Sequence, residues 1–140
     1  MTIKISKNKK IFDFAYSFKK IIKKERWVPR YDIESDSLSM TVSKLPNDAR
    51  IKYFGNNEIA FYLTKNNDIK GIFIEYFKSN FIEHHKEFKG LIEDIKEKDK
   101  TEESLIELKR NKINKVVPEF EEIIQESLTE NVKFESIINE

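Results

Sequence analysis

The chain has 140 residues and a net charge of +1, a length that suits one ordinary domain able to bury a core without cross-links. It contains no Cys, which excludes disulfide frameworks, zinc–thiolate sites, thiol nucleophiles and iron–sulfur clusters. No run of 18 apolar residues and no signal-peptide core is present, and Lys, Ile and Asn are abundant, so we expect a cytoplasmic protein of prokaryotic origin without a membrane span.

Residues 8–26 are predicted to form a basic amphipathic helix. Ile11, Phe14 and Phe18 recur at three- and four-residue steps, while lysines occupy the other side. Pro29 is expected to end the helix, since the residue before a proline is pushed out of the helical region. The apolar face favours a helix that packs on a core, and a helix lying on a membrane or a nucleic acid is the alternative.

Residues 30–77 are predicted to form a small antiparallel meander of three or four strands. The stretch 37–43 alternates apolar with hydroxyl side chains, which is typical of a strand with one solvated face. Two apolar runs, 58–64 and 69–77, flank a four-residue polar loop and predict a hairpin. Gly71 in the second run indicates a bulge or a close approach of neighbouring backbone.

Residues 79–140 are predicted to form an acidic region with two or three helices. A helix start is expected at Asn80. A following helix, with Thr101 as its N-cap, is expected to carry Leu105 and Ile106, and Pro118 marks a kink or the first turn of a third helix. These helices carry more apolar residues than a three-stranded sheet requires. They either form a helical hairpin or bury that surface against another chain. Together the elements predict a single α+β domain over residues 1–140.

The middle of the chain carries a recognisable motif, with a Tyr-Asp start, acids at two-residue spacing, and a later apolar strand that runs through a Gly. The residues that carry it are Tyr31, Asp32, Glu34, Asp36, Leu38, Ile69, Gly71, Ile72 and Ile74. On these residues, the stretch of roughly 29–77 resembles the bacterial and archaeal family catalogued as domain of unknown function 2283. Ser39 and Met40 stand where Tyr-Ile is usual, and Phe73 stands where Glu is usual. The resemblance implies a small antiparallel β domain, brings no catalytic residue, and leaves the flanking helices uncovered.

Asp32, Glu34 and Asp36 are the strongest candidates for a metal-binding or acid–base cluster. An EF-hand loop counted from Asp32 needs Gly at its sixth position and Glu at its twelfth, but Ser37 and Ser43 stand there. An extended backbone would place the three carboxylates on one face, yet further ligands would have to converge on them. We therefore favour the interpretation that these acids rim a turn and face water.

His84 and His85 are the only histidines. Adjacent helical positions point about 100° apart, so the two cannot bind one metal as neighbours, and one His with one acid makes a poor metal site. The sequence also lacks a Gly-x-Ser-x-Gly turn and a phosphate-cradling glycine loop. We predict no catalytic residue, no metal ligand and no cofactor, and hence a protein that is not an enzyme.

Charge is distributed unevenly, since residues 1–30 carry a net charge of +8 and residues 75–140 carry −6. This polarity fits a basic arm for nucleic acid, two ends that attract each other, or two ends that each meet a partner. Our leading hypothesis is a non-enzymatic interaction module, such as an antitoxin or a defence-system accessory protein, that binds another protein or forms a homo-oligomer. The partner-binding candidates are Phe81, Phe88, Leu91, Ile95, Ile113, Val116, Phe120 and Ile123.

The alternative hypothesis is a DNA- or RNA-binding protein that uses the basic helix, because each Lys or Arg can neutralise one phosphate. Against it, the aromatics near these lysines, which include Tyr16 and Trp27, mostly belong to the apolar stripe, and no helix-turn-helix or RNP-type sequence is present. The nucleic-acid-binding candidates are Lys19, Lys20, Lys23, Lys24 and Arg26.

Overall fold

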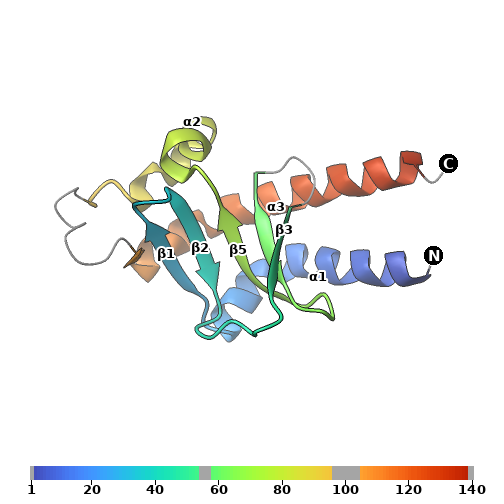
Figure 1. The fold of residues 1–140 in the computed structure, drawn as a ribbon. Helices are drawn as coiled ribbons and strands as arrows, with labels where there is room; N and C mark the ends of the chain where they lie inside the picture. Colours follow the sequence, from blue (N-terminus) through green and yellow to red (C-terminus); the bar gives the residue numbers. More distant parts are fainter. Residues whose placement is uncertain (1, 54–57, 96–104, 139–140) are drawn as a thin grey trace.

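The structure, a computed structural model, describes residues 2–53, 58–95 and 105–138. It confirms the predicted α+β class, with an N-terminal helix, an antiparallel sheet and C-terminal helices (Figure 1). None of the helices in these ranges is long and apolar enough to cross a membrane.

Two long helices cover one face of the sheet. Helix α1 (Thr2–Lys24) and helix α3 (Arg110–Ile138) lie side by side, and both extend beyond the sheet towards the chain termini (Figure 1). The rings of Phe18 on α1 and Phe120 on α3 meet edge to face, 6.2 Å apart. The basic N-terminal helix therefore packs beside the acidic C-terminal helix, an arrangement that attraction between the two ends of the chain favours.

Side chains of α3 also bond to the backbone of α1. The carboxylate of Glu121 accepts a hydrogen bond from the backbone N–H of Lys19 at 3.0 Å, and the amide of Gln125 donates to the carbonyl of Ala15 at 3.3 Å. These two backbone groups are four residues apart, which is the spacing of a bonded pair within an α-helix. Polar contacts of this kind fix the two helices in register.

The prediction of a three- to four-stranded meander is wrong in the number and order of the strands. Six strands run in the order β3-β4-β5-β2-β1-β6, and every neighbouring pair is antiparallel. The β1–β2 hairpin and the β3–β4–β5 meander join because β5 pairs with β2. The strands are β1 (Val28–Asp32), β2 (Ser37–Thr41), β3 (Arg50–Tyr53), β4 (Ala60–Leu63), β5 (Ile69–Ile74) and β6 (Leu105–Glu107).

The strand predicted over 37–43 is confirmed as β2, but the solvated face predicted for its hydroxyl residues is wrong at Ser37 and Thr41, which are 8% and 5% exposed. Leu38 and Met40 are each 1% exposed and pair with Ile74 and Ile72 of β5, so all four point towards the helices. Ser39 is only partly buried and lies on the other face. The apolar residues of β2 therefore follow a period of two on the core face, whereas on the other face only Ser39 of this central strand is partly exposed.

Both interpretations offered for Gly71 hold. A Cβ atom at this position would lie 2.6 Å from Cγ2 of Thr41, 2.9 Å from Cδ2 of Tyr62 and 3.0 Å from the carbonyl oxygen of Met40, so a side chain here would require its neighbours to shift. The pairing of β4 with β5 also shifts register between Tyr62 and Leu63, next to this glycine. Gly71 is therefore required by space in the interior of the sheet.

The single helix predicted from Asn80 is replaced by three short pieces: a π-helix, η1 (Phe77–Phe81), one turn of α-helix, α2 (Ile82–His84), and a 3₁₀-helix, η2 (Lys86–Leu91). His85 separates the last two, because its φ of −139° and ψ of 75° lie outside the helical region. The apolar stripe still reaches the core, although the helix that was expected to carry it is broken.

The helix predicted around Leu105 and Ile106 is wrong at its start. These residues belong to β6, where Ile106 pairs with Tyr31 of β1. The N-cap expected at Thr101 lies outside the described residues. Downstream, α3 passes through Pro118 without a break in helical assignment, so no separate helix begins there.

Helix α1 ends at Lys24, before the point at which Pro29 was expected to end it. Arg26 has a φ of 52°, and the backbone N–H of Trp27 donates to the carbonyl of Ile22 at 3.0 Å. A left-handed residue followed by this bond is the Schellman termination, here with Arg in the place that Gly usually takes. The termination turns the chain so that Trp27 points into the core.

Candidate functional site

Asp36, the third acid of the sequence motif, is bound by the protein itself. Its carboxylate accepts hydrogen bonds from the hydroxyl of Tyr31 at 2.7 Å, from the backbone N–H groups of Lys78 and Ser79 at 2.7 and 3.0 Å, and from the hydroxyl of Ser79 at 2.8 Å. Its own carbonyl accepts from the backbone N–H of Phe77 at 2.9 Å. Asp36 therefore fastens the β1–β2 turn to the start of η1.

These bonds shift the titration of both partners. Burial alone would raise the pKa of Asp36, but the hydrogen bonds from Tyr31, Lys78 and Ser79 stabilise the carboxylate and hold that pKa below its ordinary value. The pKa of Tyr31 is raised, first by burial and then by its bond to Asp36. The pair is a phenol kept protonated by a carboxylate kept charged, which is an arrangement that stabilises a turn.

The three acids do not form a cluster. Asp32 accepts a bond from the backbone N–H of Glu34 at 3.1 Å, which is a local turn contact, and Glu34 is exposed. Over the described ranges, no group of three or more His, Cys, Asp or Glu residues is placed to hold a metal ion. The interpretation of acids that shape a turn fits, with the difference that Asp36 points into the protein instead of facing water.

The two histidines point to different places. Nδ1 of the exposed His84 lies 2.9 Å from the carbonyl of Asn80, as in a bond back along its own turn. His85 lies 4.6 Å from the ring of Phe81, and its Nε2 is 3.0 Å from the Glu58 carboxylate. Each histidine thus has a structural partner, and the two do not share a ligand.

The residues predicted to bind a partner lie inside the molecule. Seven are buried and Ile95 is partly buried against them. The rings of Phe88 and Phe120 are 4.6 Å apart and close the space between η2 and α3. The apolar stripe therefore covers the sheet of its own chain and offers no surface for a partner. The set is Phe81, Phe88, Leu91, Ile95, Ile113, Val116, Phe120 and Ile123.

The cations predicted for the nucleic-acid alternative all lie on the surface. We call this set the basic row; none of its side chains pairs with a carboxylate within the described part of the chain. Tyr16 is 68% exposed on the same helix, whereas Trp27 is 2% exposed. Tyr16 is therefore an aromatic among the lysines and not a part of the apolar stripe. The basic row comprises Lys19, Lys20, Lys23, Lys24 and Arg26.

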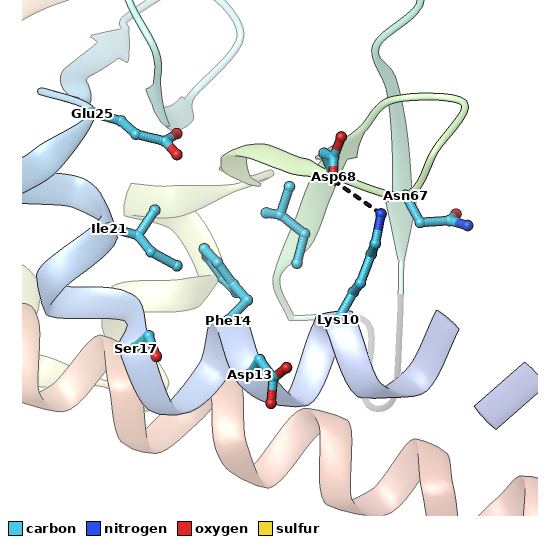
Figure 2. Close-up of a pocket in the computed structure, with 9 residues that line it drawn as sticks. Lys10, Asp13, Phe14, Ser17, Ile21, Glu25, Asn67 and Asp68 are labelled. Atoms are coloured by element: carbon cyan, nitrogen blue, oxygen red, sulfur yellow. Dashed lines mark hydrogen bonds and ion pairs between the residues drawn. The ribbon is translucent and has the colours of Figure 1, made fainter. Parts of the chain in front are cut away.

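One flank of α1 forms a cleft of about 400 Å³ against the turn between β4 and β5; we call it the polar cleft. Lys10 donates to Asp68 at 3.1 Å across one end of it (Figure 2). At the other end, Glu25 pairs with Lys70 at 3.7 Å and accepts from the indole of Trp27 at 3.2 Å. The charged groups at both ends of the cleft therefore pair with each other, and these ion pairs connect α1 to the sheet.

The other flank of α1 forms a groove of about 380 Å³ against α3 and the sheet; we call it the basic groove. Its floor is apolar and buried, and it is built by Ile22, Trp27, Pro29, Met40, Ile113 and Val117. Its rim is polar and exposed, and it is built by Lys19, Lys23, Arg110 and Asn114. An apolar concave floor with a few convergent polar groups is the usual composition of a binding site.

The open face of the sheet carries aromatic side chains. Tyr62 and Phe73 meet edge to face at 6.3 Å, and Ile51 next to them is 45% exposed. Burial, followed by the nearby Glu75, raises the pKa of Tyr53 to about 12. These tyrosines are therefore neutral at ordinary pH and offer this face no charge to recognise.

Comparison with family models, curated proteins and solved structures finds no match to this chain. The likeness of residues 29–77 to domain of unknown function 2283 therefore stays a prediction.

Proposed function

We propose that this protein is a non-enzymatic interaction module of a prokaryotic cytoplasm that binds an acidic protein partner through the basic row. The observation that carries the proposal is the exposure of all five cations without an ionic partner in the described part of the chain. Opposed potentials steer association and select partners, so a row of unpaired cations favours an acidic surface. An antitoxin or a defence-system accessory protein would use such a surface.

Tyr16 gives this face an anchor. It lies three and four positions before Lys19 and Lys20, so the three side chains are neighbours on the helix. Tyrosine and arginine are enriched among the residues that dominate binding energy at interfaces. We expect Tyr16 to contribute contact area, while the lysines contribute the rate of association and its salt dependence.

The second candidate is single-stranded nucleic acid, which the exposure of Tyr16 among lysines favours. Such sites combine cations that follow the phosphates with aromatic rings on which bases stack. The basic groove next to the row argues for protein instead. Its floor of Trp27, Met40 and Val117 suits an apolar side chain, which a phosphate backbone does not carry.

The test is a pull-down from the native host with the protein and with Lys20→Glu/Lys24→Glu/Arg26→Glu. We expect an acidic protein to be retained by the native chain and lost by the variant. The absorbance ratio of the eluate at 260 and 280 nm should be that of protein. Retention of nucleic acid, or of nothing, contradicts the proposal.

A matched control separates the basic row from net charge. Lys44→Glu/Lys65→Glu/Lys89→Glu removes the same charge from exposed lysines outside α1. Retention should survive in this control at moderate salt. Equal loss in both triple variants would indicate general attraction to a cationic protein and would contradict a specific surface on α1.

A further inference from the structure

We infer that the basic groove is where the acidic partner inserts one large apolar side chain, with carboxylates on either side of that anchor bound by Lys19, Lys23 and Arg110. The inference rests on the proposed function, because it gives the chemistry of the segment that the basic row would bind.

The floor of the basic groove supplies the apolar half of this recognition. Trp27, Met40 and Val117 are 2%, 1% and 3% exposed, and they come from the α1 termination, β2 and α3. Because the indole of Trp27 is fixed by a bond to Glu25 and stacks on Phe14 at 5.7 Å, the floor is held in place before any partner arrives. Preorganisation of this kind lowers the entropic cost of binding.

The rim supplies the charged half. Lys19 and Lys23 stand on α1 and Arg110 stands at the start of α3, so cations border the groove from two elements. None of the three pairs with a carboxylate within the described ranges. Cations on two sides of one apolar slot match a peptide segment with acids before and after its anchor. A single free carboxylate would neutralise only one of them.

The size of the groove limits what it can hold. Its volume of about 380 Å³ lies near the lower end of the range for small ligand sites, about 300–1,000 Å³. That space suits one aromatic or branched side chain rather than a whole amphipathic helix. The rest of the segment would lie over the basic row.

The test uses two labelled glutamate-rich peptides, one with a central phenylalanine and one with alanine in its place. Binding is followed by fluorescence anisotropy at low salt. Burial of one phenylalanine ring should make the first peptide bind about ten- to hundredfold more tightly to the native chain. Trp27 is the only tryptophan of the chain, so its emission should shift with the first peptide and not with the second.

Asn114→Phe probes the groove without a change in charge. Asn114 is an exposed rim residue, so a ring placed there fills the groove from outside and spares the core. This variant should bind the two peptides equally, with the affinity that the native chain has for the alanine peptide. Circular dichroism verifies that the fold is retained.

Two double variants with the same change in charge probe the rim. Lys19→Glu/Lys23→Glu reverses rim cations, whereas Lys20→Glu/Lys24→Glu reverses cations of the same helix that do not line the groove. The Lys19/Lys23 variant should weaken the binding of both peptides more than the Lys20/Lys24 variant does. The second should leave the preference for the phenylalanine peptide intact. Equal loss in the two double variants overturns the inference.

The remaining outcomes separate the inference from the proposed function. Equal, salt-sensitive binding of both peptides to the native chain overturns the inference and leaves the proposed function standing. If neither peptide binds to the native chain, both the inference and the proposed function are contradicted. A shift of Trp27 emission with decanoate but with neither peptide would assign the groove to a free amphipathic carboxylate. If the protein dimerises in solution and the dimer does not bind the peptide, the groove would be assigned to a second copy of the chain. Either assignment overturns the inference.

Discussion

The polar cleft and the basic groove, the two hollows on either side of α1, have similar volumes of about 400 and 380 Å³. They differ in whether their charged side chains form ion pairs. In the polar cleft, Lys10 meets Asp68 and Glu25 meets Lys70, so cation and anion come from opposite walls. In the basic groove, Lys19 and Lys23 face an apolar floor and find no carboxylate in the described ranges. The lysines of one helix therefore divide into those that form ion pairs within the fold and those that form none in the described ranges.

The walls opposite α1 explain this difference. The polar cleft faces the β4–β5 turn, where the sequence supplies Asn67 and Asp68 for turn chemistry. The basic groove faces β1, β2 and α3, whose inward side chains are apolar because they belong to the core. Cations on that rim form no ion pair within the described structure, which is why we assign them to a partner.

The largest expected effect concerns Phe14, which joins the two hollows. Its ring lines the polar cleft and stacks at 5.7 Å on Trp27 in the floor of the basic groove. Phe14→Ala should lower the free energy of unfolding by about 3–5 kcal/mol, since it removes a 3%-exposed ring and leaves a cavity. Urea denaturation measures the loss.

Tyr16→Ala is the matched control, because this ring is on the same helix and 68% exposed. It should change the free energy of unfolding by less than about 0.5 kcal/mol. A loss below about 1 kcal/mol for Phe14→Ala would mean that the two hollows do not share a packed wall.

Much of the fold follows from local patterns. The alternation of β2 and the hairpin of β4 and β5 were predictable, because period two and a polar loop are properties of consecutive residues. The order of the strands was not, since the pairing of β2 with β5 joins residues thirty or more positions apart. Likewise, β6 has only three residues, too few for periodicity to distinguish a strand from a helical turn.

A second large effect is expected at Asp36, the most heavily bonded acid described above. Asp36→Ala should lower the free energy of unfolding by about 1–3 kcal/mol or more, because it leaves backbone donors at the start of η1 without an acceptor. Asp36→Asn should cost less, since Asn tolerates the φ of 50° and keeps one oxygen acceptor. Equal stability of the native chain and the alanine variant would contradict the role of Asp36 as a fastener.

The stabilisation by Asp36 should depend on pH. Its pKa is held below the ordinary 3.8, so the native state favours the charged form. The resulting stability is fully present above the unfolded pKa and is lost as pH falls through the folded pKa. The stability gap between the native chain and Asp36→Asn should therefore be larger at neutral pH than at a pH below 3.8, as measured by urea denaturation. If the difference in stability between the native chain and Asp36→Asn became larger at low pH, a lowered pKa of Asp36 would be contradicted.

The candidate site was half predictable. The basic row follows from a run of like charges along one predicted helix, which needs no knowledge of the fold. The groove does not, because Trp27, Met40, Arg110 and Val117 come from segments that meet only when the sheet and both helices have assembled. The exposure of Tyr16 was hidden for a different reason. Most aromatic residues near the lysines were assigned to the apolar stripe without separating Tyr16, although position 16 lies outside the three- and four-residue steps of Ile11, Phe14 and Phe18.

A smaller effect of opposite sign is expected at Arg26, which belongs to the basic row and ends α1. Its φ of 52° is unfavourable for a side chain with Cβ, so Arg26→Gly should raise the free energy of unfolding by up to about 1 kcal/mol. The same change removes one cation and should weaken binding of the acidic partner. Thermal denaturation and peptide binding measure the two effects. If Arg26→Gly lowers the free energy of unfolding instead, the guanidinium group of Arg26 stabilises the fold and is not free for a partner.

The smallest effect tests the comparison of the two hollows directly. Lys10→Gln removes an ion pair whose partners are each 50% exposed, so we expect a loss of at most about 0.5–1 kcal/mol, reduced by added salt. Lys23→Gln removes a cation that has no ion pair in the described structure, so the free energy of unfolding should change by no more than about 0.5 kcal/mol, through the favourable place of this cation in the last turn of α1. Urea denaturation at two salt concentrations measures both variants. Because partner binding should respond in the reverse order, a Lys23 variant that loses stability but binds normally would mean that the basic groove belongs to the fold and not to a partner.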